Sequence, residues 1–365
     1  MKPRTTLKKY IARKTRKYRT ISSDNEDILL KRNTHLLNRK KGIARCMPLL
    51  SPIYDNTQNI KAGDKLLLTM GKDEGKRIPY FLEYYRQLGI DHFFFIDNDS
   101  IEPMADSLSG MPDVSLWHTK DSYSGSNYGV DWMNVINGHY APGHWTLTVD
   151  LDEFLVFPYM EDRSFSELCL HLDNMEQASM FCPLIDMYPN GPISDAVVPP
   201  GDNPLNYADH FDVVGYHSER GIFDDVWIRG GPRCRVFNHG DVQKSPSINK
   251  TPLMKWNDDT LYLVSTHTAY PFEYNQPHNN GISSVTGALL HFKFTSDMTK
   301  KAEYAVKHKN HYKESREYIE YLKTLERDEH LNLTSPVSAK YINSHSLIDA
   351  KLMNTALWGF QHNPR

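Results

Sequence analysis

Apolar and polar positions alternate between two patterns from Lys65 to Asp150. Short continuous apolar runs, typical of buried parallel strands, alternate with segments whose apolar residues recur at helical spacing. The apolar runs predict four strands, at 65–70, 92–99, 113–119 and 145–149. The periodic segments predict two helices, at 77–89 and 127–140. This alternation predicts an α/β fold with a doubly wound, mostly parallel sheet flanked by helices.

The segment 77–89 shows the helical pattern most clearly. Its apolar side chains recur every three or four positions, at Ile78, Phe81, Leu82, Tyr85 and Leu88. Gly89 follows where a helix commonly ends on a glycine in the left-handed conformation.

The pattern changes after Pro158. A helix is predicted over 164–175, because Ser164 and Glu167 have the spacing of a capping box. Further strands are predicted at 178–185, 261–270 and 288–294. Residues 188–232 are rich in Gly, Pro, Asn and Asp and are predicted to form long loops, and the charged segment 296–327 is predicted to be helical. We therefore divide the chain into an N-terminal extension (1–60), an α/β domain (61–295) and a C-terminal helical region (296–365).

The N-terminal extension concentrates positive charge. Residues 1–45 carry 15 Lys and Arg against 3 Asp and Glu, although the whole chain has a net charge of −3. A solvated tail explains such a run, and so does docking of residues 1–22 on an anionic membrane surface. The remaining chain is acidic and has no nucleic-acid-binding motif, so we expect no nucleic-acid partner.

The sequence lacks the motifs of several protein classes, which are therefore disfavoured. It has no G-x-G-x-x-G and no G-x-x-x-x-G-K-[ST], the fingerprints of dinucleotide enzymes and P-loop NTPases. Its four cysteines show no C-x-x-C spacing, which argues against a structural zinc site or a disulfide framework. No apolar run approaches the roughly 20 residues that span a membrane, and the N-terminus has no signal-peptide core. We expect a cytoplasmic protein, peripheral on the inner face of the membrane if the tail docks there.

Acidic and amide side chains follow three of the predicted strands. Ligands of open parallel sheets bind beyond the carboxyl ends of the strands, so these side chains are expected to share one edge. They are Asp73 and Glu74 after the first strand, Asp97, Asn98 and Asp99 at the second, and Asp150, Asp152 and Glu153 after the fourth. Each alone is commonly a turn or cap residue. A D-x-D after a buried strand also suits Mg²⁺ or Mn²⁺ bound to diphosphate oxygens.

The order of motifs resembles the bacterial family 2-type glycosyltransferases of GT-A fold whose core motif is DxDEFL. The similarity covers roughly residues 62–345. It rests on KDEGKRIPYFLEYYRQLGIDHFFFIDNDS (72–100), SYSGSNYGVDWMN (122–134), TVDLDEFLVFP (148–158), LIDMYPNG (184–191), GGPRCRVF (230–237), TPLMKW (251–256), STHTAYPF (265–272) and GALLHFKF (287–294). Lys72-Asp73-Glu74 stands where the family usually has Arg-Asn-Glu.

The resemblance implies a metal-dependent transferase with a nucleotide-sugar donor, UDP-sugar favoured. Asp150 and Asp152 match the metal and diphosphate motif, and Glu153 supports it. Glu74 and Asp97, with the adjoining Asp73 and Asn98, match positions near the nucleotide. A late histidine often completes the metal site; of His267 and His291, His267 is our choice. The acceptor would be a surface polysaccharide or a lipid-linked saccharide.

Other residues receive roles from the chemistry that an inverting transfer needs. Asp186, at the end of a predicted strand, is the candidate general base; a retaining enzyme would give it another role. Arg233, Arg235 and Lys255 are candidates for holding the diphosphate or an anionic acceptor. Tyr128 and Trp132 are candidates for stacking on the base or sugar, with core packing as the alternative.

Two other functions stay open. A haloacid-dehalogenase-type phosphohydrolase also uses D-x-D after a strand, but it places that motif early and has Thr or Val where this chain has Phe154. A non-catalytic saccharide-binding or assembly protein on the same fold is the alternative from another class. Metal-dependent binding of a nucleoside diphosphate distinguishes the transferase from both.

Overall fold

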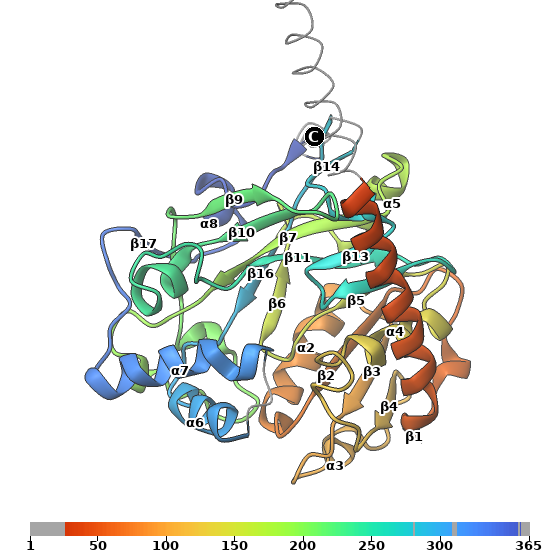
Figure 1. The fold of residues 1–365 in the computed structure, drawn as a ribbon, viewed down its shortest axis with the longest axis horizontal. Helices are drawn as coiled ribbons and strands as arrows, with labels where there is room; N and C mark the ends of the chain where they lie inside the picture. The colour runs from red at the N-terminus through yellow and green to blue at the C-terminus, as the bar shows by residue number, and fades with distance from the viewer. Residues whose placement is uncertain (1–25, 280–281, 309–311, 357, 359–365) are drawn as a thin grey trace, which may run out of the picture.

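A nine-stranded sheet forms the centre of the computed structural model, which describes residues 26–279, 282–308, 312–356 and 358 (Figure 1). The strand order is β1-β4-β3-β2-β5-β11-β7-β16-β6. The bounds are β1 Ser51–Tyr54, β2 Leu66–Gly71, β3 His92–Asp97, β4 Val114–His118, β5 Trp145–Thr148, β6 Glu153–Val156, β7 Ser179–Asp186, β11 Asn249–Lys255 and β16 Ala288–His291. Strands β4, β3, β2, β5, β7 and β16 run in one direction, and β1, β11 and β6 run against them. The expected α/β fold with a mixed, mostly parallel sheet is confirmed at this level.

Helices cover both faces of the parallel part of the sheet. Leu67 of β2 packs in the same core as α2 (Ile78–Leu88) and α5 (Phe165–Asn174). Leu66 and Leu68 point to the other face, where α4 (Val130–Tyr140) packs. Successive residues of a strand face opposite sides, so a continuous apolar run is what a strand covered on both faces requires.

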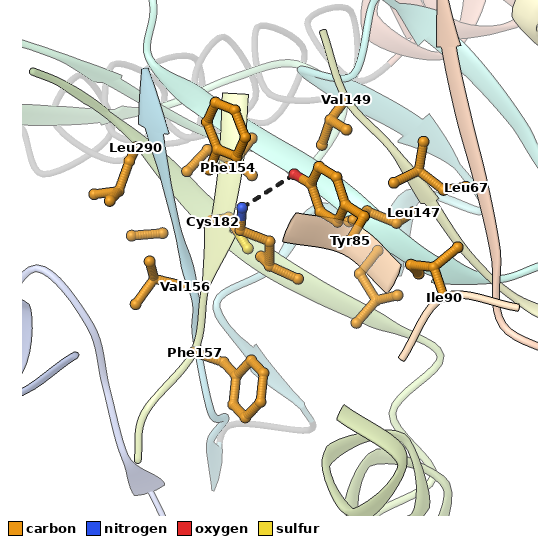
Figure 2. Close-up of a cluster of buried hydrophobic side chains, with 14 of the residues drawn as sticks. Leu67, Tyr85, Ile90, Leu147, Val149, Phe154, Val156, Phe157, Cys182 and Leu290 are labelled. Carbon is orange, nitrogen blue, oxygen red and sulfur yellow. Dashed lines mark hydrogen bonds between the residues drawn. The ribbon is translucent and has the colours of Figure 1, made fainter. Parts of the chain in front are cut away.

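Helix α2 is fastened to the strand that begins at Glu153. The buried hydroxyl of Tyr85 donates a hydrogen bond to the carbonyl oxygen of Glu153 (2.8 Å) and accepts one from the backbone N–H of Leu155 (3.1 Å). Figure 2 shows the Tyr85 ring reaching into the core between Leu147 and Phe154, with a hydrogen bond to its hydroxyl dashed. This contact fixes the start of β6, and therefore the turn before it, against the helical layer.

Local signals in the sequence are confirmed at two helix ends. Gly89 ends α2 with φ 106°, a conformation that favours glycine. Ser164 and Glu167 form the expected capping box at the start of α5.

Two segments differ from the predictions. Residues 261–270 form a hairpin, β12 (Leu261–Val264) and β13 (Thr268–Tyr270), rather than one strand. Residues 296–327 contain two helices, α6 (Met298–His308) and α7 (Tyr312–Arg327). The polar S-T-H stretch in the first segment marks the turn, whereas the charged second segment has helical spacing on both sides of its break.

Part of the predicted N-terminal extension packs against the α/β domain. Residues 26–46 are helical, and β1 pairs antiparallel with β4 at the sheet edge. The helix is held to the α/β domain by ion pairs Arg32–Asp224 (3.0 Å), Arg39–Asp131 (2.5 Å) and Arg45–Asp121 (2.9 Å). Strand β1 is short, mostly exposed and contains Pro52, so it lacks the apolar run that identifies a strand. The rest of the predicted extension, residues 1–25, lies outside the described residues.

The remaining elements are short and lie around both halves of the sheet. The helices are α3 Met104–Leu108 and α8 Ser344–Asp349, with a π-helical turn at Arg233–Phe237 and 3-10 turns at Met47–Leu49, Thr57–Asn59, Gly75–Arg77, Ile193–Asp195, Pro204–Asn206 and Phe272–Asn275. The strands are β8 His210–Asp212, β9 His217–Arg220, β10 Val226–Arg229, β14 His278–Asn279, β15 Ile282–Ser283 and β17 Ser338–Lys340. Figure 1 shows α6 and α7 at the opposite end of the molecule from helix 26–46.

Candidate functional site

The sheet topology gathers acidic side chains at one edge. β5, β7 and β16 run in the same direction, so their carboxyl ends meet there, and antiparallel β6 begins there. In the register, His291 at the end of β16 is opposite Glu153 of β6 and Asp186 of β7. The Asp150–Asp152 turn lies between β5 and β6, and its middle residue, Leu151, is buried in the core. The topology thus places the D-x-D turn beside Asp186 and His291.

A chain of polar contacts connects the D-x-D turn to Asp186. The Nδ1 atom of His291 is 2.7 Å from Oδ1 of Asp186, and its Nε2 atom is 3.7 Å from Oδ2 of Asp152. Arg233 donates to the same Asp186 oxygen at 2.7 Å, and its NH2 atom is 2.8 Å from His291 Nδ1. Asp186 Oδ1 is thus held by both Arg233 and the Nδ1 side of the His291 ring. The Nε2 atom of the same ring faces Asp152.

The charges around this chain favour an ionised Asp186 and a neutral His291. Burial raises the pKa of Asp186, but Arg233 and His291 outweigh burial and lower that pKa to about 2. Burial lowers the pKa of His291, which disfavours its protonated form. A carboxylate with so low a pKa is a weak proton acceptor. The predicted role of Asp186 as general base therefore stays a prediction, and the resting contacts assign it to orienting His291.

Lys250 lies behind the turn, at the start of antiparallel β11. Its Nζ atom is 2.5 Å from Oε1 of Glu153 and 3.3 Å from Oδ2 of Asp150. Burial lowers the pKa of Lys250, but Glu153 and Asp150 outweigh burial and raise it, so the ammonium is charged. The backbone N–H of Asp150 also donates to Glu153 Oε2 (3.2 Å). Glu153 thus supports the D-x-D turn from behind, where the sequence placed it.

More cations surround Asp152 from the other side. Burial raises the pKa of Asp152, but His291, Arg77, Lys301 and Lys293 together lower it well below its usual range. Glu74 holds Arg77 (2.8 Å) and Lys301 (2.5 Å), so the first strand end is joined to α6.

A pocket opens beside this turn. Leu151 and Phe154 form its wall on the β6 side, and Arg77 belongs both to the pocket and to the surroundings of Asp152. The lining also includes Lys76, Tyr80, Val198, Pro199, Asp202, Pro204, Thr295, Ser296 and Asp297. The lining mixes cations, carboxylates and apolar side chains, and both of its cations pair with Asp297.

The predicted residues of the second strand end have structural partners. Asp97 is buried, and its two carboxylate oxygens accept from the backbone N–H groups of Ser100 (2.9 Å) and Met104 (3.0 Å). Asn98 donates to the carbonyl oxygens of Thr119 and Asp121, both at 3.1 Å. Asp73 accepts from the N–H of Ile101 at 2.7 Å. These residues shape the loops of the edge, and a nucleotide contact of Asp97 or Asp73 stays a prediction.

For Trp132 the structure favours core packing, the alternative to stacking on the base or sugar. It is fully buried, and its indole N–H is 3.2 Å from Asp121 Oδ2. Helix α4 is buried at every position from Val130 to Asn137, so a large side chain on it packs in the core whichever way it points. Tyr128 is half-buried with its ring 5.8 Å from that of Tyr123. Asp150 contributes to the raised pKa of Tyr123, after burial, which places Tyr123 near the turn.

The structure places both late histidines near the turn, and the choice of His267 as the third metal ligand stays a prediction. The Nδ1 atom of His267 is 2.5 Å from the carbonyl oxygen of Asn249, and burial lowers the pKa of His267 to about 4, with smaller effects of Lys250 and Asp150. The Nε2 atom of His291 is 3.7 Å from Oδ2 of Asp152. Sequence reasoning preferred His267 because it stands in a polar S-T-H-T stretch, while His291 ends an apolar strand.

Sequence reasoning missed Lys250, Arg77, Lys293 and Glu317. Glu317 of α7 is 3.1 Å from Lys293 and 3.8 Å from Arg233, so α7 contributes to the site. Among the other candidates, Arg235 binds Asp212 (2.9 Å) and Lys255 binds Asp173 (2.7 Å), away from the turn. A lysine within a strand that is otherwise buried, as in N-K-T-P-L-M, was the available signal for Lys250.

A divalent metal fits these residues only together with a further ligand. Within the described part of the chain, no three His, Cys, Asp or Glu side chains form a metal-binding group. Mg²⁺ and Mn²⁺ at phosphate sites take one or two carboxylates and complete their shell with phosphate oxygens and water. Asp152 and His291 offer an oxygen and a nitrogen 3.7 Å apart, and Asp186 holds the second ring nitrogen as metal-bound histidines require.

The chain matches no known protein-family model and no curated protein. No helix among the described residues is both long and apolar enough to cross a membrane.

Proposed function

We propose that this protein is a glycosyltransferase that moves a sugar from a nucleotide-sugar donor, a UDP-sugar favoured, to a saccharide or lipid-linked saccharide. The observation that carries the proposal is the chain Asp152–His291–Asp186–Arg233 at the carboxyl edge of a mostly parallel sheet. It combines a half-exposed acidic turn, a neutral imidazole and buried cations where such sheets bind ligands. The GT-A family assignment belongs to this proposal.

Different residues of the site would bind the metal and stabilise the departing nucleoside diphosphate. Asp150, Asp152 and His291 would hold Mn²⁺ or Mg²⁺ with the donor diphosphate, and the bound metal would offset the charge of the leaving nucleotide. Arg77, Lys301 and Lys293 already lower the pKa of Asp152, so they also lie close enough to stabilise a diphosphate. All of these cations are paired with carboxylates, but Arg233 is the most buried of them, with its side chain 6% exposed and bound to Asp186.

The test is a calorimetric titration of the full chain with UDP, GDP and CDP, each with and without Mn²⁺. Metal-dependent binding of one nucleotide supports the proposal and identifies the donor class. A folded protein that binds none of them favours the non-catalytic saccharide-binding alternative. Phosphate release from small phosphoesters would instead indicate a phosphohydrolase.

An anionic membrane surface is the proposed partner of the N-terminal region. Helix 26–46 faces the domain with its arginines and exposes Leu30 (66%) and Leu37 (55%), seven residues apart, on the outside. Lys40 and Lys41 are exposed on the same helix. Exposed leucines beside lysines suit a lipid headgroup layer better than a nucleic acid. Such docking would bring the site near a lipid-linked acceptor.

A further inference from the structure

The ammonium of Lys250 already neutralises charge at the D-x-D turn. Its side chain is 6% exposed and that of Glu153 is 1% exposed, so neither charge is solvated by water. A buried carboxylate needs such a partner, and the 2.5 Å contact between Lys250 Nζ and Glu153 Oε1 supplies it. Lys250 and Glu153 therefore form a fixed pair behind the turn.

The contact of Lys250 with Asp150 is of a different kind. It is longer, at 3.3 Å, and the Asp150 side chain is 52% exposed. Asp150 can thus exchange Lys250 for another cation without exposing a buried charge. A metal at the turn would lie close to the Lys250 ammonium, which repels it and competes for the same carboxylate.

We propose that Lys250 makes metal binding at this site conditional on the nucleotide diphosphate. In the free protein Lys250 occupies Asp150, and Asp152 with His291 gives too few ligands to hold the metal tightly. A diphosphate brings oxygen ligands together with negative charge that offsets the ammonium. Lys250 is then a positioning residue that couples the two ligands, an inference that rests on the proposed transferase function.

The coupling has a thermodynamic signature. If the nucleotide tightens Mn²⁺ binding by some factor, Mn²⁺ tightens nucleotide binding by the same factor. We expect a factor of about 10 to 100 for the wild-type protein, within the usual range of coupling between two sites. Lys250 contributes to this factor because its ammonium weakens the binding of Mn²⁺ alone. The negative charge of the nucleotide offsets the ammonium, so Mn²⁺ binds more tightly when the nucleotide is present.

The experiment measures both affinities by calorimetry, with Mn²⁺ binding confirmed by electron paramagnetic resonance. Mn²⁺ and the nucleoside diphosphate that binds best among UDP, GDP and CDP are titrated alone and each in the presence of the other. In Lys250→Met, Mn²⁺ alone should bind about tenfold more tightly, and the coupling factor should fall at least fivefold. Lys250→Arg keeps the charge and should keep most of the coupling.

Lys255→Met is the matched control. Lys255 lies on the same strand, but it is 40% exposed and pairs with Asp173. Its replacement should change neither affinity. If Lys250→Met unfolds because Glu153 loses its partner, Lys250→Met with Glu153→Gln removes both buried charges and leaves Asp150 available.

The outcomes separate the two proposals. A folded wild-type protein without coupled binding of metal and nucleotide overturns the transferase proposal. Coupled binding in the wild type, with the same coupling in folded Lys250→Met or in folded Lys250→Met with Glu153→Gln, overturns the role of Lys250 alone.

Discussion

His291 lies with its Nδ1 atom 2.7 Å from Oδ1 of Asp186, a contact between the ends of two adjacent parallel strands. The register fixes this contact, because His291 is the partner of Asp186 in the β16–β7 ladder. The second ring nitrogen of His291 thereby faces Asp152, which lies in the turn between β5 and β6. The His291–Asp186 part of the site therefore depends on the sheet register, whereas Asp150 and Asp152 are placed by the turn between β5 and β6.

Replacing the two late histidines should have unequal effects. His291→Ala removes the nitrogen that faces Asp152, and we expect at least tenfold weaker binding of Mn²⁺ and nucleotide together. His267→Ala removes a side chain whose Nδ1 contacts a backbone carbonyl, and the coupled affinity should change less than twofold. Calorimetry on both variants checks this, with circular dichroism as the test of folding. A larger loss in His267→Ala would restore the histidine that the sequence favoured.

Asp152→Asn should abolish turnover while the protein stays folded. The amide keeps the size of the side chain but cannot supply the negative charge that offsets Arg77, Lys301 and Lys293. Removing one electrostatic group of this kind commonly costs a hundredfold or more in rate, so release of nucleotide from the donor should fall at least that far. Asp173→Asn is the control, since Asp173 pairs with Lys255 away from the turn. Near-normal turnover in Asp152→Asn would refute the role of the turn.

The sequence predicted the parallel half of the sheet well. There each strand is a continuous apolar run, and each helix shows its own period, as in β2, α2 and β3. It did not predict β1, β6 or β11. Pro52 interrupts β1, β6 follows the acidic turn directly, and β11 has Lys250 and Pro252 among its apolar residues.

The sequence predicted the acidic residues of the site but not its cationic residues. Strand-end carboxylates share one edge by topology alone, so Asp150, Asp152 and Asp186 could be selected from the sequence. Lys250, Arg77 and Lys293 come from separate elements, and one sequence has no signal for their pairing with Asp152 or Glu153. Trp132 could not be decided for a related reason: the pattern shows that it lies on a helix, but not that this helix is covered on all sides.

Glu317 should stabilise the docking of α7 in a pH-dependent way. Burial raises the pKa of Glu317, but Lys293 and Arg233 outweigh burial and lower it to about 2. An unfolded glutamate has a pKa near 4.3. The lowered folded-state pKa means that the stabilisation is complete above about pH 4.3 and is lost as the pH falls towards 2.

Glu317→Gln measures this contribution. The shift corresponds to roughly 3 kcal/mol, and the 29% exposure of the side chain reduces our expectation to about 1–2 kcal/mol at pH 7. Urea unfolding of wild type and variant at pH 7 and pH 3 should show a difference that shrinks with acid. Glu320→Gln on the same helix, where Glu320 pairs with exposed Lys323, should change stability by less than 0.5 kcal/mol. An equal difference at both pH values would show that Glu317 acts through packing.

Deleting residues 1–22 should weaken binding to anionic vesicles. Nine of the first twenty residues are Lys or Arg, and each basic residue near an anionic surface contributes about 1 kcal/mol. We expect at least tenfold weaker sedimentation with vesicles containing 30% phosphatidylglycerol, no binding to zwitterionic vesicles, and unchanged nucleotide binding.

Leu30→Ser with Leu37→Ser should weaken the binding to anionic vesicles several-fold, because two exposed apolar side chains are lost. Ile101→Ser, at an exposed apolar position (84%) outside the helix, is the control and should bind like wild type. Vesicle binding that survives the deletion would exclude the basic segment as the anchor, and equal binding by the leucine variant would exclude the outer face of helix 26–46.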